Sequence, residues 1–262
     1  MDNTYPSRLR EQQDALIHDL FPSRSSMGRP RVHGRRTILN AIFYVIRSGC
    51  PWHYLPHDFP PWQTVSGYFR RWKRAGLWDI IHDVLVQAVR EAHGQHPNPT
   101  AAILDSQSVK PAAQAGERGY DAGKKSKGRK RPLLVDTLGL ILQVVVTPAS
   151  VQDREGARAV LALLAHWFSR RRVVWGDGGD AGSLVEWLWQ VRTQRKIRLE
   201  IVKRHKQPRG FVVLPKRWIV ERTLGWLMKN RRRRCDDEQL METSEAMIRI
   251  AMIRLMLRRL HP

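Results

Sequence analysis

The chain has 262 residues, with 46 Lys and Arg against 24 Asp and Glu, so its formal net charge is +22. Solubility alone requires a net charge of only about 8 or less, so this surplus predicts a polyanionic partner. Hydrophobic residues make up 42% of the chain and include 10 Trp, which excludes an intrinsically disordered polymer. A chain of this length has room for two domains.

Membrane and disulfide-rich classes fit the sequence poorly. It contains no apolar run of about 18 residues, no basic amphipathic helix or lipidation motif, and no signal-peptide pattern. Its two cysteines, Cys50 and Cys235, lack the spacing of zinc ligands or of a disulfide framework. We therefore expect a cytosolic protein that binds nucleic acid and no membrane.

Residues 1–97 have the pattern of a small all-α domain. Apolar residues at helical spacing predict helices near 9–20, 38–46, 64–75 and 77–89. The helix near 64–75 places its aromatic residues on one face and its basic residues elsewhere, which predicts packing on one side and phosphate contacts on the other. Those basic residues are Arg70, Arg71, Lys73 and Arg74.

A segment with two prolines and one glycine, 94–100, predicts a linker, and we assign 98–262 to a second domain. Short apolar runs of strand length follow it, then alternating helical and strand patterns, so we expect an α/β domain with a mixed sheet flanked by helices. The predicted strands are 101–105, 133–135, 140–146, 173–175, 197–202 and 211–214, and the predicted helices lie near 157–168, 216–232 and 240–258.

Three carboxylates stand on separate elements of this second domain. Asp105 ends an apolar strand, Asp177 precedes two glycines at a strand-to-loop junction, and Glu221 lies on a helix. Taken singly, they are explained as a loop cap, a turn residue and an ion-pair partner of Arg217, four residues earlier. Taken together, they are the hard oxygen ligands that magnesium requires for phosphodiester chemistry.

Several motifs occur along nearly the whole chain. They are 28–31 (GRPR), 57–62 (HDFPPW), 102–110 (AILDSQSVK), 123–131 (GKKSKGRKR), 134–139 (LVDTLG) and 215–223 (PKRWIVERT). With these motifs the chain resembles insertion-sequence transposases of the insertion-sequence five family, within the insertion-sequence four superfamily. The resemblance implies a ribonuclease-H-like catalytic domain preceded by a helical domain that recognises the ends of the element.

The resemblance also implies a site and its partners. Asp105, Asp177 and Glu221 match the DDE triad, which binds two Mg²⁺ ions, with Mn²⁺ as a substitute, and catalyses cleavage and strand transfer. Arg217 matches the arginine that holds DNA phosphate beside the glutamate. The implied partners are double-stranded DNA, both terminal inverted repeats and target, and a second copy of the chain in the DNA complex.

Two basic runs allow two explanations each. Six basic residues within eight form either a solvated loop or a phosphate-binding segment, and their position near Asp105 favours phosphate binding. They are Lys124, Lys125, Lys127, Arg129, Lys130 and Arg131. The run 231–234 either binds phosphate or complements the dipole of the preceding helix.

The sequence departs from the family pattern at Pro132, Asp180, Arg233 and Asp237, where a histidine, an aromatic, an apolar residue and an aromatic are typical. Asp180 adds negative charge beside Asp177, so we expect it to weaken DNA engagement. Two other functions remain open at this point: a DNA-binding protein without catalysis, and a metal-dependent nuclease without strand transfer.

Overall fold

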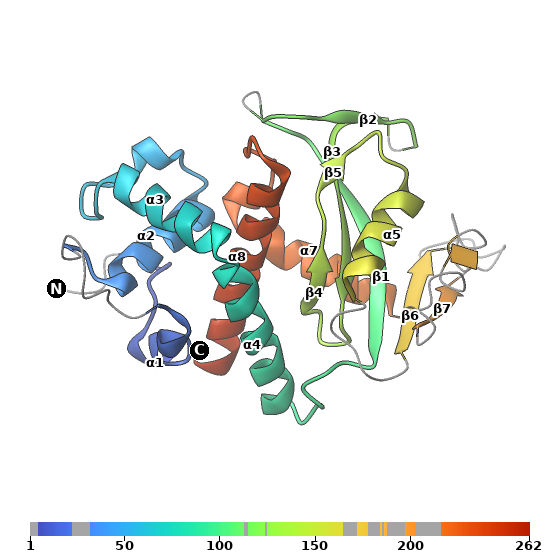
Figure 1. Cartoon of the computed structure of the whole chain (residues 1–262), viewed down its shortest axis with the longest axis horizontal. Helices are drawn as coiled ribbons and strands as arrows, with labels where there is room; N and C mark the ends of the chain where they lie inside the picture. The colour runs from blue at the N-terminus through green and yellow to red at the C-terminus, as the bar shows by residue number, and fades with distance from the viewer. Residues whose placement is uncertain are drawn as a thin grey trace. The chain divides into compact units, whose positions relative to one another are not determined.

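The chain forms two compact units in a computed structural model that describes residues 5–22, 32–112, 115–123, 125–164, 172–177, 184, 186–187, 197–202 and 216–262. Unit 1 comprises residues 1–93, 227–234 and 246–262, and unit 2 comprises 94–226 and 235–245 (Figure 1). The first boundary between the two units, between residues 93 and 94, falls at the start of the predicted linker 94–100. Two C-terminal segments join unit 1, however, although the prediction placed all of 98–262 in one domain.

Unit 1 is helical, as the sequence predicted. Its elements are α1 (Glu11–Ala15), η1 (His18–Leu20), α2 (Arg35–Ser48), η2 (Trp52–Tyr54), α3 (Trp62–Arg74), α4 (Leu77–Ala92), η5 (Arg231–Arg233) and most of α8 (Met241–Leu260). Helix α8 is apolar on nearly every side, since Met247, Ile250, Met252 and Ile253 are all buried. A helix of this kind requires neighbours around it, which explains why it joins the N-terminal helices.

Helix α2 ends at Gly49, whose φ of 77° lies in the left-handed region that favours glycine. A Cβ there would lie 3.0 Å from the Cβ of Arg231 and 3.2 Å from the backbone of Arg232. The close approach of η5 to the end of α2 therefore depends on a glycine. The Arg232 guanidinium secures the same contact by donating to the Cys50 carbonyl oxygen at 3.0 Å.

Helix α3 has the two-sided character that the sequence predicted. Val65, Phe69 and Trp72 are buried, and the Trp72 ring meets the Trp78 ring edge-on with centroids 5.6 Å apart. Its basic residues Arg70, Arg71 and Arg74 are exposed, and Lys73 is half-buried. The helix is thus anchored by aromatic packing and presents cations to solvent.

Unit 2 contains a mixed sheet made of β1 (Ala101–Val109), β2 (Gly119–Asp121), β3 (Ser126–Val135), β4 (Ile141–Val144), β5 (Thr147–Pro148), β6 (Arg172–Asp177) and β7 (Ile197–Val202). Strand β3 pairs antiparallel with β1 on one side and with β4 on the other. Strands β1, β6 and β7 are parallel neighbours. The resulting order β4-β3-β1-β6-β7, antiparallel and then parallel, is that of a ribonuclease-H-like sheet and confirms the predicted fold class.

Helix α5 (Asp153–Leu164) covers one face of this sheet (Figure 1). Its residues Ala157, Val160 and Leu161 form a buried cluster with Ala102 of β1, Leu134 of β3 and Val174 of β6. Because successive strand residues alternate between faces, Ile103, Asp105 and Trp175 belong to the opposite face. Helix α7 (Arg217–Met228) lies in unit 2 up to Trp226.

The differences from the predicted elements are local. Helix α7 ends at Met228, before the predicted 232, and the predicted strand 211–214 lies outside the described residues. Within the described part of the chain, no helix has the length and apolar character needed to cross a membrane.

Candidate metal site and nucleic-acid interface

Asp105 and Asp177 lie on neighbouring parallel strands. The β1–β6 ladder pairs Ala101 with Val173 and Ile103 with Trp175. Continuing this register by two residues along β1 and β6 brings Asp105 level with Asp177. Parallel strands are about 4.8 Å apart, so the two backbones are close neighbours at the carboxyl end of β6. Asp177 also pairs with Val202 of β7, so it belongs to the sheet.

Asp105 is half-buried, and its Oδ1 accepts a hydrogen bond of 2.7 Å from the backbone amide of Ser106. A local amide bond of this kind fixes the orientation of a carboxylate and stabilises its charged form. Asp105 lies within β1 and does not end it as the sequence predicted, and its carboxylate is held on the sheet face opposite α5.

The N-terminus of α7 approaches this same sheet face. The Nζ atom of Lys216, the residue before α7, lies 3.4 Å from the ring centroid of Trp175 on β6. Trp175 is oriented in turn by its indole N–H, which donates to Oε2 of Glu200 on β7 at 2.9 Å. Sequence reasoning did not identify Trp175 or Lys216. Trp175 stands two residues before Asp177 and therefore lies on the same face of β6.

Glu221 is exposed on α7, while the adjacent Val220 is fully buried. At about 1.5 Å per residue, Glu221 lies about 7 Å along the helix from Lys216, which contacts the sheet. The opposite side of this helix is anchored to the turn between β3 and β4, because Thr223 Oγ1 donates to the Gly139 carbonyl oxygen at 2.8 Å. Helix α7 is therefore fixed at both its start and its middle.

The turn that receives α7 is itself rigid. Asp136, which is fully buried, accepts hydrogen bonds at Oδ1 from the amides of Leu138 and Leu140, at 3.0 and 2.7 Å. Gly139 has a φ of 80°, and a Cβ there would lie 2.7 Å from Thr223 Oγ1. A side chain at Gly139 would thus collide with the helix that carries Glu221.

The carboxylates provide the chemistry that divalent metals need, since Mg²⁺ and Mn²⁺ prefer oxygen ligands with positions left open for substrate. The side chains that the structure describes contain no group of three His, Cys, Asp or Glu able to hold a metal. The side chain of Asp177 is outside that set. The fit to metal therefore depends on the strand register and the residue types rather than on a complete ligand geometry.

The basic run at 124–131 is largely not a loop, which corrects part of the prediction. Strand β3 begins at Ser126, and Arg129, Lys130 and Arg131 are buried, with relative exposures of 0%, 6% and 1%. They are therefore not available to DNA. Lys125 and Lys127 are exposed and keep their predicted role as a proposal, whereas Lys124 lies outside the described residues.

The buried arginines form ion pairs and hydrogen bonds with other residues of unit 2. Arg129 and Arg131 both approach the buried carboxylate of Asp236, at 3.1 and 3.5 Å. Arg129 also donates to the carbonyl oxygens of Glu117 and Glu238, at 2.8 and 2.7 Å. Burial lowers the pKa of the Arg131 guanidinium, and the Asp236 carboxylate opposes that shift. These arginines are therefore paired inside unit 2 and do not face a polyanion.

Lys130 also has internal partners. Its Nζ lies 3.1 Å from Oδ1 of Asp153, at the start of α5, and 3.5 Å from Oδ2 of Asp121 on β2, and it donates to the Val151 carbonyl oxygen at 2.9 Å. It joins three segments around β3, which is a structural role that the charge run alone did not reveal.

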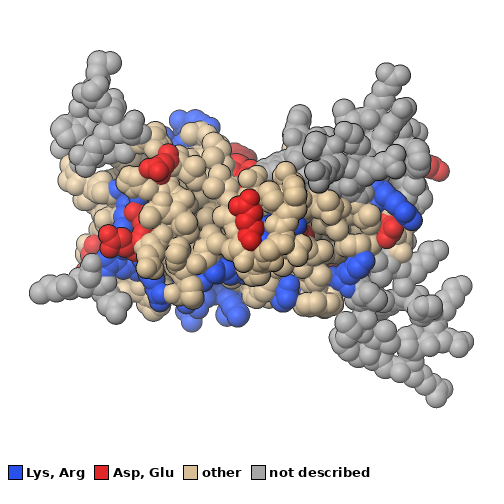
Figure 2. All heavy atoms as spheres, turned by 90° about the horizontal axis from the view of Figure 1, so that it is seen from below, with Lys and Arg blue, Asp and Glu red and all other residues tan. Residues whose placement is uncertain are grey.

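The run 231–234 forms η5, after the end of α7, so it does not occupy the last turn of that helix as one explanation required. Arg232 and Arg233 are buried, and Arg231 and Arg234 are exposed. Figure 2 shows that Lys and Arg side chains reach the drawn face in several separate groups, with Asp and Glu among them. The surplus of basic residues is thus divided between buried pairs and several surface groups.

Three of the four departures from the family pattern lie in described segments. Pro132 is buried in β3, and its ring lies where a Cβ on Gly156 of α5 would collide, at 2.8 Å. Arg233 is fully buried, and Asp237 is half-buried. Asp180 lies outside the described residues.

The fold and the two neighbouring acids define a ribonuclease-H-like protein with a candidate site where Asp105, in the middle of β1, lies beside Asp177, at the end of β6. Residues 96–256 match the family described as "Transposase DDE domain", and residues 9–82 match the family described as "Putative transposase of IS4/5 family". The first match covers more than half of the chain, so the chain belongs to the transposase DDE domain family. This confirms the family resemblance seen in the sequence.

Individual relatives are more distant. The insertion element IS402 uncharacterized 16.2 kDa protein of Burkholderia cepacia is 31% identical over 85 residues, which are 32% of this chain and 56% of that protein. The chain therefore spans about half the length of this relative. The crystal structure of the Mos1 strand transfer complex aligns with 14% identity and a TM-score of 0.23, over 68% of this chain and 60% of that one.

Proposed function

We propose that the protein is a magnesium-dependent transposase that cleaves DNA at the ends of an insertion element and joins those ends to target DNA. The observation that carries the proposal is the register that aligns Asp105 with Asp177 on neighbouring parallel strands. Membership of the transposase DDE domain family supports it. The position of Asp177 at the carboxyl end of β6 also agrees with the general position of active sites in α/β sheets.

In this proposal Asp105, Asp177 and Glu221 would hold two Mg²⁺ ions. Bound metal would supply activation of water, or of a DNA 3′ hydroxyl, and stabilisation of the leaving oxygen. The Ser106 amide orients the Asp105 carboxylate at 2.7 Å. Lys216 and the turn at Gly139 hold α7 at two points, which limits the movement of Glu221 relative to the sheet.

DNA binding in this proposal uses cations that the structure leaves at the surface. Lys125 and Lys127 are exposed and flank the start of β3, and Arg217, which is half-buried, precedes Glu221 by one helical turn. In unit 1, the exposed face of α3 is suited to the phosphate backbone, so we assign recognition of the element ends to this unit. Two copies of the chain would act together, one at each end of the element.

The proposal is tested by removing each carboxylate charge without changing its size. Asp105→Asn, Asp177→Asn and Glu221→Gln are each expected to abolish cleavage of DNA carrying the element ends, while affinity for that DNA persists. Glu91→Gln, an exposed glutamate at the end of α4, is the matched control and should cleave normally. Normal cleavage by any of the three site variants would remove that residue from the site.

Metal dependence and product analysis distinguish the alternatives. A DNA-binding protein without catalysis would give no cleavage with or without Mg²⁺, and its DNA affinity would not change with EDTA. A nuclease would cleave with Mg²⁺ but leave a labelled target plasmid unjoined. Joined product that appears with Mg²⁺ or Mn²⁺ and disappears with EDTA is the result expected for a transposase.

A further inference from the structure

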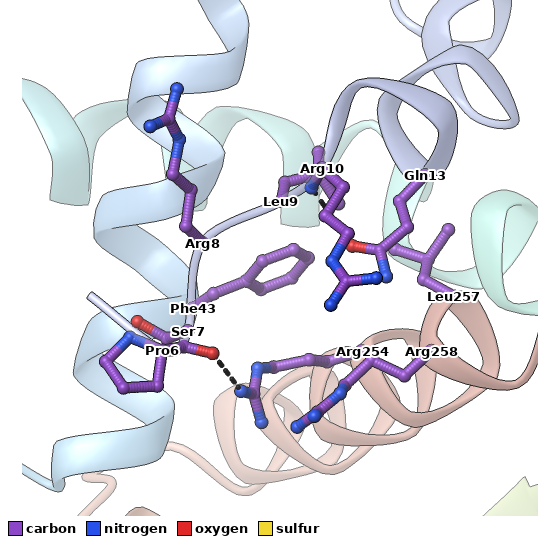
Figure 3. A pocket seen from close by; sticks show the side chains of 10 residues that line it. All are labelled: Pro6, Ser7, Arg8, Leu9, Arg10, Gln13, Phe43, Arg254, Leu257 and Arg258. Atoms are coloured by element: carbon purple, nitrogen blue, oxygen red, sulfur yellow. Dashed lines mark hydrogen bonds between the residues drawn. The ribbon is translucent and has the colours of Figure 1, made fainter. Parts of the chain in front are cut away.

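A cavity of about 50 Å³ lies within unit 1. It is formed by the segment before α1, by Phe43 of α2 and by the C-terminal part of α8 (Figure 3). One enclosed water needs about 10–15 Å³ of such volume, so this cavity is large enough for a few waters or one tetrahedral oxyanion. Its polar lining is dominated by arginines, and the lining residues include no Asp or Glu.

Two of these arginines are neighbours on α8. Arg254 and Arg258 are four residues apart, so they share one helical face, and Figure 3 shows their guanidinium groups side by side below the Pro6–Ser7 segment. Arg254 is only 9% exposed and donates one hydrogen bond, from Nη2 to the Pro6 carbonyl oxygen at 3.2 Å. Among the described residues, no hydrogen bond or ion pair is recorded for Arg258.

The charge on Arg254 is uncompensated. Burial, together with the charges of Arg258 and Arg47, lowers the pKa of its guanidinium to about 10. No carboxylate among its described neighbours opposes this shift. Two acids of unit 1 have other partners, since Asp14 pairs with Arg35 at 2.6 Å and Asp58 accepts from the Tyr5 hydroxyl at 2.8 Å.

Simple packing does not account for this arrangement. An arginine can bury its aliphatic stem and keep its head in water, as Arg258 could at its exposed position. Arg254 differs, because the residue is 9% exposed, one of its five N–H donors bonds to a described residue, and a second cation lies beside it. Neighbouring guanidinium groups with free donors are the arrangement that binds phosphate oxygens.

We propose that this cavity is a phosphate-binding site, in which Arg254 and Arg258 donate to the oxygens of one phosphate group. Arg10 lines the cavity as well, but its Nη1 already donates to the Pro262 carbonyl oxygen, so it has a secondary role. The phosphate belongs either to a DNA backbone or to a free anion. The DNA case rests on the proposed function, and the free-anion case does not.

The first experiment uses inorganic phosphate as the probe and requires neither metal nor cleavage. Titration calorimetry of the full chain with phosphate should show saturable binding at constant ionic strength set with chloride. Arg258→Met, at an exposed position, should weaken that binding roughly tenfold, as expected for loss of one charged hydrogen-bonding group. Arg254→Met should abolish it. Arg259→Met, at the next residue of α8 and outside the cavity lining, should bind as the unmodified chain does.

Absence of saturable phosphate binding, or equal binding by the Arg254→Met and unmodified chains, would overturn the site. The second experiment assigns the source of the phosphate. If the ligand is a DNA phosphate, Arg258→Met lowers duplex affinity and the slope of log affinity against log salt by about one contact, or roughly 0.9. If the duplex affinity of Arg258→Met is unchanged while its phosphate binding is weakened, the site takes a free anion. Neither readout depends on Asp105, Asp177 or Glu221, so failure here is separate from failure of the proposed catalysis.

Discussion

Arg129 Nη1 donates a hydrogen bond of 3.1 Å to Oδ1 of Asp236, and both side chains are fully buried. The same carboxylate accepts from Ser244 Oγ at 2.7 Å and lies 3.5 Å from Arg131. One acid therefore pairs with two buried cations and links β3 to the segment that leads into α8.

Removal of this acid should be strongly destabilising. In Asp236→Asn, two buried guanidinium groups lose their counter-charge, and breaking a buried pair costs about 3–5 kcal/mol. Urea denaturation should show that loss in the free energy of unfolding. Asp237→Asn, at the adjacent half-buried position, should cost far less, and comparable losses for the two variants would contradict the assigned role of Asp236.

The two exposed lysines beside β3 should affect DNA and not stability. Lys125→Gln with Lys127→Gln should reduce the slope of log affinity against log salt by up to about 1.8, because each phosphate contact contributes roughly 0.9. The thermal midpoint should not change. An unchanged slope would show that these lysines do not contact DNA. Neutralising Arg129 and Arg131 as well should unfold unit 2, which makes that larger variant unsuitable as a test of DNA binding.

Trp175 should position α7. Trp175→Leu removes both the ring under Lys216 and the donor to Glu200, and a cation–π contact alone is worth about 0.5–2 kcal/mol. Magnesium-dependent cleavage should therefore fall by roughly tenfold with little change in DNA affinity. Trp175→Phe keeps the ring and should recover part of the loss. Equal activity in all three proteins would show that the contact does not position Glu221.

Asp180→Tyr should raise cleavage of element-end DNA. The substitution restores the aromatic that the family resemblance implies and removes a negative charge three residues beyond Asp177. A single charge–charge interaction screened by water is worth under about 1 kcal/mol, so the increase should be moderate. Cleavage rates at saturating magnesium, measured on folded proteins, test this. A rate equal to or below that of the unmodified chain would show that the aspartate is tolerated or useful.

Stability of unit 1 should depend on Arg254 in a pH-dependent way. Its folded-state pKa of about 10 lies below the ordinary value of an arginine, so below pH 10 the folded state carries the full penalty of a buried cation. Arg254→Met should therefore raise the thermal midpoint near pH 8 in phosphate-free buffer. That gain should shrink as the pH rises above 10, where the folded chain releases the proton. A gain that is independent of pH would assign the effect to packing alone.

Periodicity was enough to predict most of the framework. The spacing of Val65, Phe69 and Trp72 gave α3, and the short β-branched runs gave β1, β6 and β7. Both patterns arise because one face of a helix or strand is buried, so residues close together in the sequence are enough to predict these elements. The alternation of strands and helices was likewise sufficient for the mixed sheet.

Long-range pairing could not be predicted in the same way. Arg129 follows several lysines in a run that resembles a solvated segment, and the acid that allows its burial lies 107 positions later. Nothing in the local pattern distinguishes it from the exposed Lys127, two residues earlier. The cation–π contact of Lys216 with Trp175 depends equally on a tertiary approach, so the candidate carboxylates were found from the sequence but the elements that hold Glu221 were not.

The last residues of the chain complete the unit that its first residues begin. Residues 227–234 and 246–262 belong to unit 1, where Arg249 pairs with Asp79 at 2.6 Å and Gln13 donates to the His261 carbonyl oxygen at 2.6 Å. Synthesis proceeds at about 5–20 residues per second from the N-terminus. The N-terminal helices therefore cannot complete their packing, and their apolar faces stay uncovered, until α8 leaves the ribosome. A ribosome that stops early would release a chain whose sheet is fully synthesised but whose helical unit cannot close.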